Sequence, residues 1–267
     1  QDNGTPPGGG IVPAEGTTAS SPEELVVSLE QANALIDLIG IREGYNALSS
    51  VIPVSGLISA GLADSTGLIG DVEAILGPAR TVDSRLAIRV VSPRPSIGVR
   101  NVRIWPSRPR SVVMRAEADG VHFTQVDYCD IPRILAEETL LEPGPTIDDG
   151  PPSISADFVQ AVREVDLERA QAALIDVAAQ GPIDSHFSQD CWHKRWSVVL
   201  CVREERTQGA WKDVGHVECF ITDHMHAHMH TPIDPRALAL MREQNAPTLD
   251  APPRTALWGF MMELLAK

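Results

Sequence analysis

Four histidines alternate with small or sulfur-containing residues near the end of the chain. If this stretch is a β-strand, the four imidazoles point to one side, because successive side chains on a strand face opposite ways. Two histidines separated by one residue on a strand can chelate zinc or nickel. Four histidines spaced about 6.6 Å apart cannot converge on one ion unless the strand bends. A metal site, adventitious metal binding and a half-buried strand with a titratable face therefore all remain as interpretations of His224, His226, His228 and His230.

A second charged feature lies between Arg85 and Arg115, where the sequence has eight arginines and no acidic residue. Residues 117 to 149 then hold nine acidic residues against one base, Arg133. The arginines could form a basic sheet face for an acidic partner. Alternatively, the two blocks neutralise each other across adjacent strands, where each exposed pair contributes only ~0–1 kcal/mol. The sequence leaves both hypotheses open for Arg85, Arg89, Arg94, Arg100, Arg103, Arg108, Arg110 and Arg115.

No catalytic motif accompanies these features: the chain has neither a glycine-rich phosphate loop nor a nucleophile elbow. Its 36 acidic and 22 basic residues give a net charge of −14. Such a surface repels the phosphates of nucleic acids and anionic membranes, and no apolar run approaches the length of a membrane span. We therefore expect a binding protein rather than an enzyme, with no cofactor, no nucleic-acid partner and no membrane partner.

The cysteines and the first residues of the chain indicate in which cellular compartment the protein is expected. Four cysteines without a CxxC pair are too few for a disulfide scaffold in 267 residues. Residues 1–22 are rich in Gly, Pro, Ser and Thr, which predicts a flexible tail. The same stretch lacks the basic start and apolar segment of a secretory signal. We expect a reduced, cytoplasmic protein.

The elements expected in the first half are a strand at 24–29, two helices, four strands and a third helix. Ser28 and Gln31 have the spacing of a capping box at the start of the first helix. The second helix, which begins at Asp71, is expected to end by Gly77, because Pro78 follows. Strands are predicted around 85–90, 101–105 and 112–115, and the fourth, 121–126, follows an Asp119-Gly120 hairpin turn. Asp130 is expected to cap the helix that carries Ile131, Ile134 and Leu135.

The second half repeats this order after a Pro/Gly-rich hinge at 142–153. Two helices, the second from Asp166 to Gly181, precede strands at 196–203 and 217–222. Helices are then expected to open at Asp234-Pro235 and at Pro252-Pro253. Strands that follow one another without intervening helices pair antiparallel, so the fold class is α+β, with a central antiparallel sheet built from two quasi-repeated halves. The predicted organisation is a tail (1–22) and a single domain (23–267) whose halves span about 23–142 and 153–267.

Four stretches of the sequence resemble the EspG family, the cytosolic chaperones of type VII (ESX) secretion systems. The residues from Leu25 to Gly40 are similar to the family's opening strand that runs directly into a helix. The residues from Ala60 to Arg85 are similar to its helix, proline and entry into the first meander. Its hairpin followed by a helix is matched by 112–141, and the helical pair that opens its second half is matched from Ile154 onward. At a turn near its penultimate strands, His224–His230 replaces the family's Gly-Arg portion after Ile221-Thr222-Asp223.

This resemblance implies a quasi-two-fold sheet flanked by helical layers. It also implies a chaperone that binds the hydrophobic tip of the PPE protein in PE–PPE heterodimers, prevents self-association and delivers the pair for export. Two other hypotheses remain open: a metal-binding protein that uses His224–His230, and a structural scaffold domain tethered by residues 1–22. The partner-binding residues expected on the sheet face and its second-half edge are Arg94, Pro95, Arg203, Glu205, Trp211, His216 and Glu218.

Overall fold

The computed structural model describes residues 24–39, 54–141, 154–182, 184–207, 210–231, 249–250 and 254–266. Its strands form a single nine-stranded sheet in the order β1-β5-β4-β3-β2-β6-β7-β8-β9, and every neighbouring pair is antiparallel. The α+β class and the antiparallel sheet predicted from the sequence are confirmed. The strands are β1 (Glu24–Val27), β2 (Ser84–Val91), β3 (Val99–Trp105), β4 (Arg110–Glu117), β5 (Gly120–Asp127), β6 (Trp196–Thr207), β7 (Ala210–Thr222), β8 (His226–Met229) and β9 (Leu249–Asp250).

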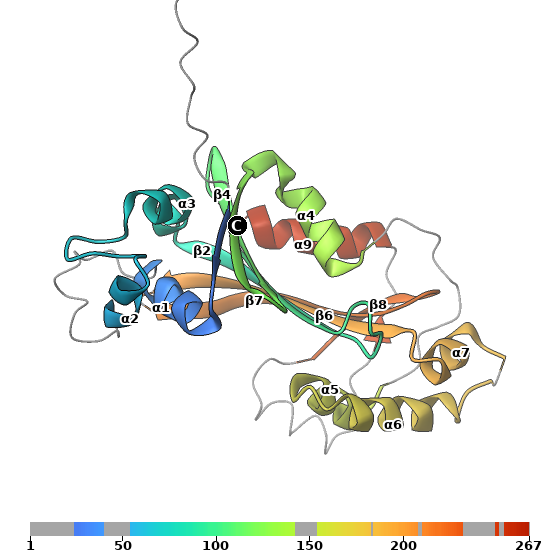
Figure 1. Ribbon diagram of the computed structural model, residues 1–267. Helices are drawn as coiled ribbons and strands as arrows, with labels where there is room; N and C mark the ends of the chain where they lie inside the picture. Colours follow the sequence, from blue (N-terminus) through green and yellow to red (C-terminus); the bar gives the residue numbers. More distant parts are fainter. Residues whose placement is uncertain are drawn as a thin grey trace, which may run out of the picture.

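The two meanders meet at the centre of the sheet, where β2 pairs antiparallel with β6 over eight residue pairs, from Ser84↔Glu205 to Val91↔Val198. The sheet extends outward through β3, β4 and β5 on one side and through β7 and β8 on the other. This central pairing joins the two meanders in one continuous sheet (Figure 1).

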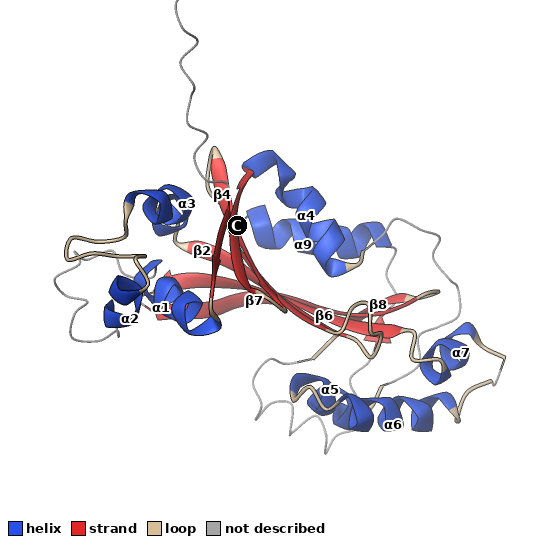
Figure 2. Ribbon diagram, in the orientation of Figure 1, coloured by secondary structure: helices blue, strands red, loops and turns tan. Residues whose placement is uncertain are grey.

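Helices cover the two faces of the sheet differently (Figures 1 and 2). One face packs against α4 and α9, with Ile88, Ile104 and Cys201 in the shared core. On the opposite face, α1, α2 and α3 pack on the first half, and α5, α6 and α7 pack on the second half. The helix bounds are α1 (Leu29–Ile39), α2 (Val54–Ser59), α3 (Gly70–Arg80), α4 (Ile131–Thr139), α5 (Ala156–Arg163), α6 (Leu167–Ala178), α7 (His186–Trp192) and α9 (Arg254–Ala266).

Local hydrogen bonds fix several helix starts as the sequence predicts. The Ser28 amide donates to Oε1 of Gln31 (2.9 Å) and the Gln31 amide donates to Oγ of Ser28 (3.2 Å), which is a reciprocal capping box. Asp166 accepts a hydrogen bond from the Arg169 amide at the start of α6. The expected cap at Asp130 is wrong, because this side chain makes no capping hydrogen bond; a short 3₁₀ turn, Tyr128–Asp130, leads into α4 instead.

Helix α3 passes Pro78, so the predicted end at Gly77 is wrong. A proline within a helix leaves the carbonyl four residues earlier without a donor. Here that carbonyl belongs to Ala74, and Nε2 of Gln125 on β5 donates to it at 2.5 Å. The replacement donor comes from the sheet, and Ala79, beyond the proline, is fully buried in the core.

The predicted β4–β5 hairpin is confirmed, with its turn one residue earlier than expected. Glu117 pairs with Gly120, so Ala118 and Asp119 form the turn and Gly120 opens β5. A Cβ at position 120 would lie 2.9 Å from the carbonyl oxygen of Val27 on β1. Because Gly120 has no Cβ, the backbone of β1 can approach β5 closely at this position.

Several predictions fall on residues outside those that the structure describes: the tail at 1–22, the hinge at 142–153 and the helix expected at Asp234-Pro235. The helix after Pro252-Pro253 is confirmed as α9. Helix α7 was not predicted, and β7 begins earlier than expected. Among the described helices, none has the length and apolar character needed to cross a membrane.

Candidate partner-binding site

Two rows of side chains cross the central strands on the face opposite α4 and α9. The strand registers place Arg103, Ala87, Val202 and His216 in one row on β3, β2, β6 and β7. The same registers place Asn101, Arg89, Leu200 and Glu218 in the next row. The rows thus run from cationic positions in the first half, through apolar ones, to titratable positions in the second half.

The β3, β2 and β6 residues of these rows form the floor of a hollow of about 360 Å³, which we call the central trough; His216 and Glu218 on β7 lie outside it. Helix α1 forms one wall through Leu29, Ala32, Asn33 and Ile36. Leu29 is 65% exposed although it is large and apolar. On the opposite side, Nη1 of Arg89 reaches the carbonyl oxygen of Arg163 at the end of α5 (3.4 Å). The trough therefore lies where the two helical groups of this face leave the centre of the sheet uncovered.

The positive charge of the trough is only partly offset, through the Glu204 carboxylate near Arg103. Among the residues that the structure describes, no carboxylate forms an ion pair with Arg89 or Arg103. Burial lowers the pKa of Arg103, with a further contribution from the nearby Arg85 guanidinium that the Glu204 carboxylate opposes. Nε of Arg89 is buried without a hydrogen-bond partner. Both guanidiniums have hydrogen-bonding capacity left for a ligand.

Arg85 lies on the same face but, unlike Arg89 and Arg103, it has an ion-pair partner and an aromatic contact. Its Nε lies 2.5 Å from Oε2 of Glu204, and its guanidinium lies 4.3 Å from the ring centroid of Trp211. The guanidinium of Arg206 also lies over the ring of Trp211, 4.9 Å from its centroid. Arg85 is thus neutralised and packed, which leaves Arg89 and Arg103 as the available cations.

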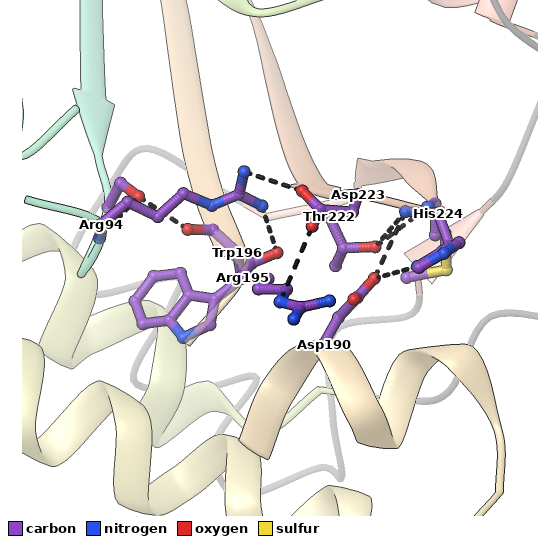
Figure 3. A network of polar contacts seen from close by, with 9 residues as sticks. Arg94, Asp190, Arg195, Trp196, Thr222, Asp223 and His224 are labelled. Carbon is purple, nitrogen blue, oxygen red and sulfur yellow. Dashed lines mark hydrogen bonds and ion pairs between the residues drawn. The ribbon is translucent and has the colours of Figure 1, made fainter. Parts of the chain in front are cut away.

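A second polar cluster lies at the far end of the sheet (Figure 3). Arg94, on the β2–β3 loop, reaches Oδ1 of Asp223 from Nη1 (2.8 Å) and donates to the carbonyl oxygen of Arg195 from Nη2 (2.5 Å). Oγ of Ser92 donates to the carbonyl oxygen of Trp196 (2.8 Å). These contacts fasten a first-half loop to the start of β6 and the β7–β8 turn.

His224 belongs to this cluster and not to a histidine strand. Its Nδ1 lies 2.9 Å from Oδ2 of Asp190, a fully buried carboxylate on α7, and its ring stacks on His186 with centroids 4.4 Å apart (Figure 3). Its backbone amide and that of Met225 donate to Oγ1 of Thr222, which shapes the turn. The side chain ties the β7–β8 turn to α7.

The other three histidines lie on or after β8. His226 is buried, and His228 packs 5.4 Å from the ring of Phe260 on α9 and 4.4 Å from His230. Ala227 and Met229 belong to the core on the opposite face, so the predicted alternation holds within β8. Within the described ranges, the one group of side chains with metal-ligand spacing is Glu117, Asp119 and His122, which contains none of the four.

No protein-family model and no curated protein sequence matches this chain. The chain is similar to the solved structure of the Mycobacterium tuberculosis type VII secretion system chaperone EspG5, in complex with a PE25–PPE41 dimer. The similarity covers 91% of this chain and 95% of that one, at 9% sequence identity and a TM-score of 0.46. At that identity and TM-score, the likeness by itself carries no argument about function.

Of the seven residues predicted to contact a partner, the structure brings three, Arg203, Glu205 and His216, to one hollow of about 360 Å³ beside α9. Arg203 and Glu205 form an ion pair beneath α9, where Nη1 of Arg203 donates to the Leu264 carbonyl oxygen (2.9 Å). Pro95 lies exposed in the β2–β3 loop beside Arg94, at the far end of the sheet. The structure brings Trp211, His216 and Glu218 to the same face as the trough.

Two of these three already have partners within the chain. Glu218 is buried and lies 3.1 Å from Nη2 of Arg163, and it also bonds Thr231. Nε2 of His216 lies 3.0 Å from the Thr231 carbonyl oxygen. The positions with free capacity, Arg89 and Arg103, were contained in the arginine block but were not singled out by the sequence.

The two hypotheses for the arginine block each describe part of it. Arg110 pairs with Asp127 and Arg115 pairs with Glu138, as the neutralising hypothesis predicts. Arg89 and Arg103 agree instead with the hypothesis of a basic sheet face. Strand alternation does not separate the two groups, because Arg85 lies on the trough face and is nevertheless paired with Glu204. The difference lies in which side chains the fold brings beside each arginine.

Proposed function

We propose that this chain is a cytoplasmic chaperone of type VII secretion. In this proposal it binds the hydrophobic tip of the PPE protein in a PE–PPE heterodimer, keeps the pair soluble and delivers it for export. The role is binding and not catalysis, and residues 23–267 act as one domain. The proposal starts from the sequence stretches that resemble the EspG family.

The local structure of those stretches supports the proposal. Strand β1 runs into α1 after a single residue, as the first stretch implies. Helix α3 contains Pro78 near its end and is followed directly by β2. The β4–β5 hairpin leads into α4. Helices α5 and α6 open the second half.

The observation that carries the proposal is the central trough. It is a hollow at the junction of the two halves, in which Leu29 and Ile36 on the wall and Leu200 and Val202 on the floor provide apolar surface beside Arg89 and Arg103. Apolar surface of this kind that is rimmed by polar residues is typical of protein-binding sites. The apolar side chains that a helical tip exposes have the size and chemistry to enter it.

Co-expression with the PE–PPE pairs of the source organism tests the proposal. We expect a soluble ternary complex with at least one pair, and that pair should aggregate when expressed alone. If every pair purifies as a soluble heterodimer without the chain, and none binds it, the proposal is wrong.

A matched pair of substitutions locates the surface. Leu29→Glu places a charge on the wall of the trough and should weaken binding about tenfold or more, as expected for a central apolar contact. Ile175→Glu on α6 alters a comparably exposed apolar residue (40% exposed) outside the trough and should leave binding unchanged. Equal losses for both variants would remove the trough from the proposal.

A further inference from the structure

The trough contains two arginines that the chain does not satisfy, although the protein has an excess of acidic residues. The net charge is −14, yet no carboxylate of the described residues forms an ion pair with Arg89 or Arg103. Elsewhere in the arginine block, acidic partners are available: Arg85, Arg94, Arg110 and Arg115 each have one. Arg100 and Arg108 also have no ion pair among the described residues, but Arg100 donates to the Ser96 carbonyl oxygen and Arg108 lies over the ring of Tyr128, and neither lines the trough.

The two guanidiniums lie close enough to act on one ligand group. Arg89 pairs with Asn101, and Arg103 pairs with Ala87, so the arginines are diagonal neighbours on one face of β2 and β3. Diagonal positions on adjacent antiparallel strands are about 7–8 Å apart, within reach of long side chains. One carboxylate placed between them can accept hydrogen bonds from both.

A partner that covers the trough must also provide acceptors for these groups. Nε of Arg89 is already buried without an acceptor, and burial already lowers the pKa of Arg103. Removing the remaining water from an unpaired guanidinium is costly, whereas a carboxylate forms strong, geometrically specific hydrogen bonds with it. A purely apolar surface would therefore be rejected, and an apolar surface with one acidic side chain accepted.

The surroundings restrict the shape of that partner. The arginines are flanked by Leu200 and Val202 on the floor and by Leu29 and Ile36 on the α1 wall. A volume of about 360 Å³ accommodates several side chains and not a whole helix. The ligand is therefore one face of a helix laid across the opening.

From this geometry we infer that the trough selects its partner by charge, through an acidic side chain on an otherwise apolar helical face that inserts between Arg89 and Arg103. The inference rests on the proposed function in that the helix belongs to the exported partner. Arg89 and Arg103 are then specificity-determining residues, and the apolar wall supplies the remaining contact.

The test uses two synthetic helical peptides with the full chain. Each is about 18 residues long, because shorter isolated helices are marginal in water. One has a leucine-rich face with a central glutamate, and the other has glutamine at that position. Calorimetry measures affinity, and the arginine Nε–Hε signals in NMR spectra report which guanidiniums are contacted.

We expect the glutamate peptide to bind at least about tenfold more tightly than the glutamine peptide, as for a desolvated charge pair. Arg89→Gln and Arg103→Gln should each remove that difference, and Arg110→Gln should retain it, because Arg110 lies outside the trough and pairs with Asp127. Equal affinities of the two peptides, no binding of either, or an equal effect of Arg110→Gln would overturn the inference. The comparison of peptides requires no protein variant, so it stands even if a substitution impairs folding.

Parallel measurements with a PE–PPE pair separate this inference from the proposed function. If a pair binds but Arg89→Gln and Arg103→Gln leave its affinity unchanged, the chaperone function stands and charge selection is wrong. If no pair binds while the glutamate peptide is preferred through both arginines, charge selection stands and the PE–PPE assignment is wrong.

Discussion

Arg94 on the β2–β3 loop and Asp223 after β7 form an ion pair (2.8 Å) that links the two halves of the chain at one end of the sheet. The residues are far apart in sequence and adjacent in space because β2 pairs with β6, and β6 with β7. The same arginine donates to the Arg195 carbonyl oxygen, so it joins Ser92 in holding the loop against the start of β6 (Figure 3).

Replacing Arg94 by alanine should release this loop. We expect faster amide hydrogen exchange across 92–98 and a loss of stability of about 1 kcal/mol or less, because the pair is partly exposed. Arg110→Ala, which removes the more exposed pair with Asp127, is the control and should leave exchange in this loop unchanged. Unaltered protection of the loop in Arg94→Ala would show that the ion pair does not hold it.

The contact between Gln125 and Ala74 predicts coupling between two distant positions. Gln125→Ala should destabilise the protein by about 1 kcal/mol, because the Ala74 carbonyl loses its donor. In a Pro78→Ala background the helix supplies its own amide to that carbonyl, so the same substitution should cost less. Denaturant unfolding of the four proteins measures this interaction energy, and strictly additive effects would contradict the explanation.

The buried carboxylate of Glu218 should be important for stability. It is 1% exposed and pairs with Arg163 at the end of α5. Glu218→Gln should cost about 2–3 kcal/mol, because a charged hydrogen-bonding group loses its partner in a buried site. Glu164→Gln, which removes a pair with Arg169 that is exposed on both sides, should have little effect in the same unfolding assay. Comparable losses would contradict the assigned burial.

Attachment of β1 should depend on pH through His122. Hydrogen bonds with Glu24 and Asp119 raise the pKa of this imidazole, with smaller contributions from the charges of Asp119 and Glu117. The hydrogen bond from His122 in turn lowers the pKa of Asp119. A raised histidine pKa stabilises the fold below the unfolded value of about 6.5, and this stabilisation is lost as the pH rises through the folded value.

The stability difference between the wild type and His122→Gln should therefore be larger near pH 5.5 than near pH 8.5. Amide exchange in 24–27 should follow the same trend, because Glu24 lies on β1. His193→Gln is the control, since that ring faces the Gln189 carbonyl oxygen and no carboxylate. A difference that is constant with pH, or that grows toward alkaline pH, would contradict the prediction.

The four thiols should react at very different rates. Cys129 is exposed, whereas Cys191, Cys201 and Cys219 are buried. Burial raises the pKa of Cys191 and of Cys201 to about 12, with a smaller contribution from Asp190 at Cys191, and burial also raises the pKa of Cys219. A thiol reagent near neutral pH should modify one equivalent rapidly in the native protein and four in denaturant. Cys129→Ser should abolish the rapid phase, and a second rapid equivalent would contradict the burial.

Much of the secondary structure was predictable because its signals are local. The capping box of Ser28 and Gln31, the β4–β5 hairpin and the helix after Pro252-Pro253 each depend on neighbouring residues, and each forms. Strand alternation also predicted the first meander, since one face of each strand must be buried. The end predicted for α3 is wrong because a distant group intervenes: Gln125 on β5 supplies the donor that Pro78 removes.

The sequence by itself determined the antiparallel class, the positions of most strands and the presence of an acid-free arginine block. Only the tertiary structure decided which arginines are available to a ligand. Strand pairing and the packing of α4 give Arg85, Arg110 and Arg115 ion pairs with acidic residues, whereas no carboxylate of the described residues forms an ion pair with Arg89 or Arg103. The tertiary structure likewise places His224 in the turn before β8, where its ring contacts Asp190 instead of continuing the row of histidines. Alternation is a property of neighbouring residues, whereas the partner of a charge is set by whichever strand or helix the whole fold brings against it.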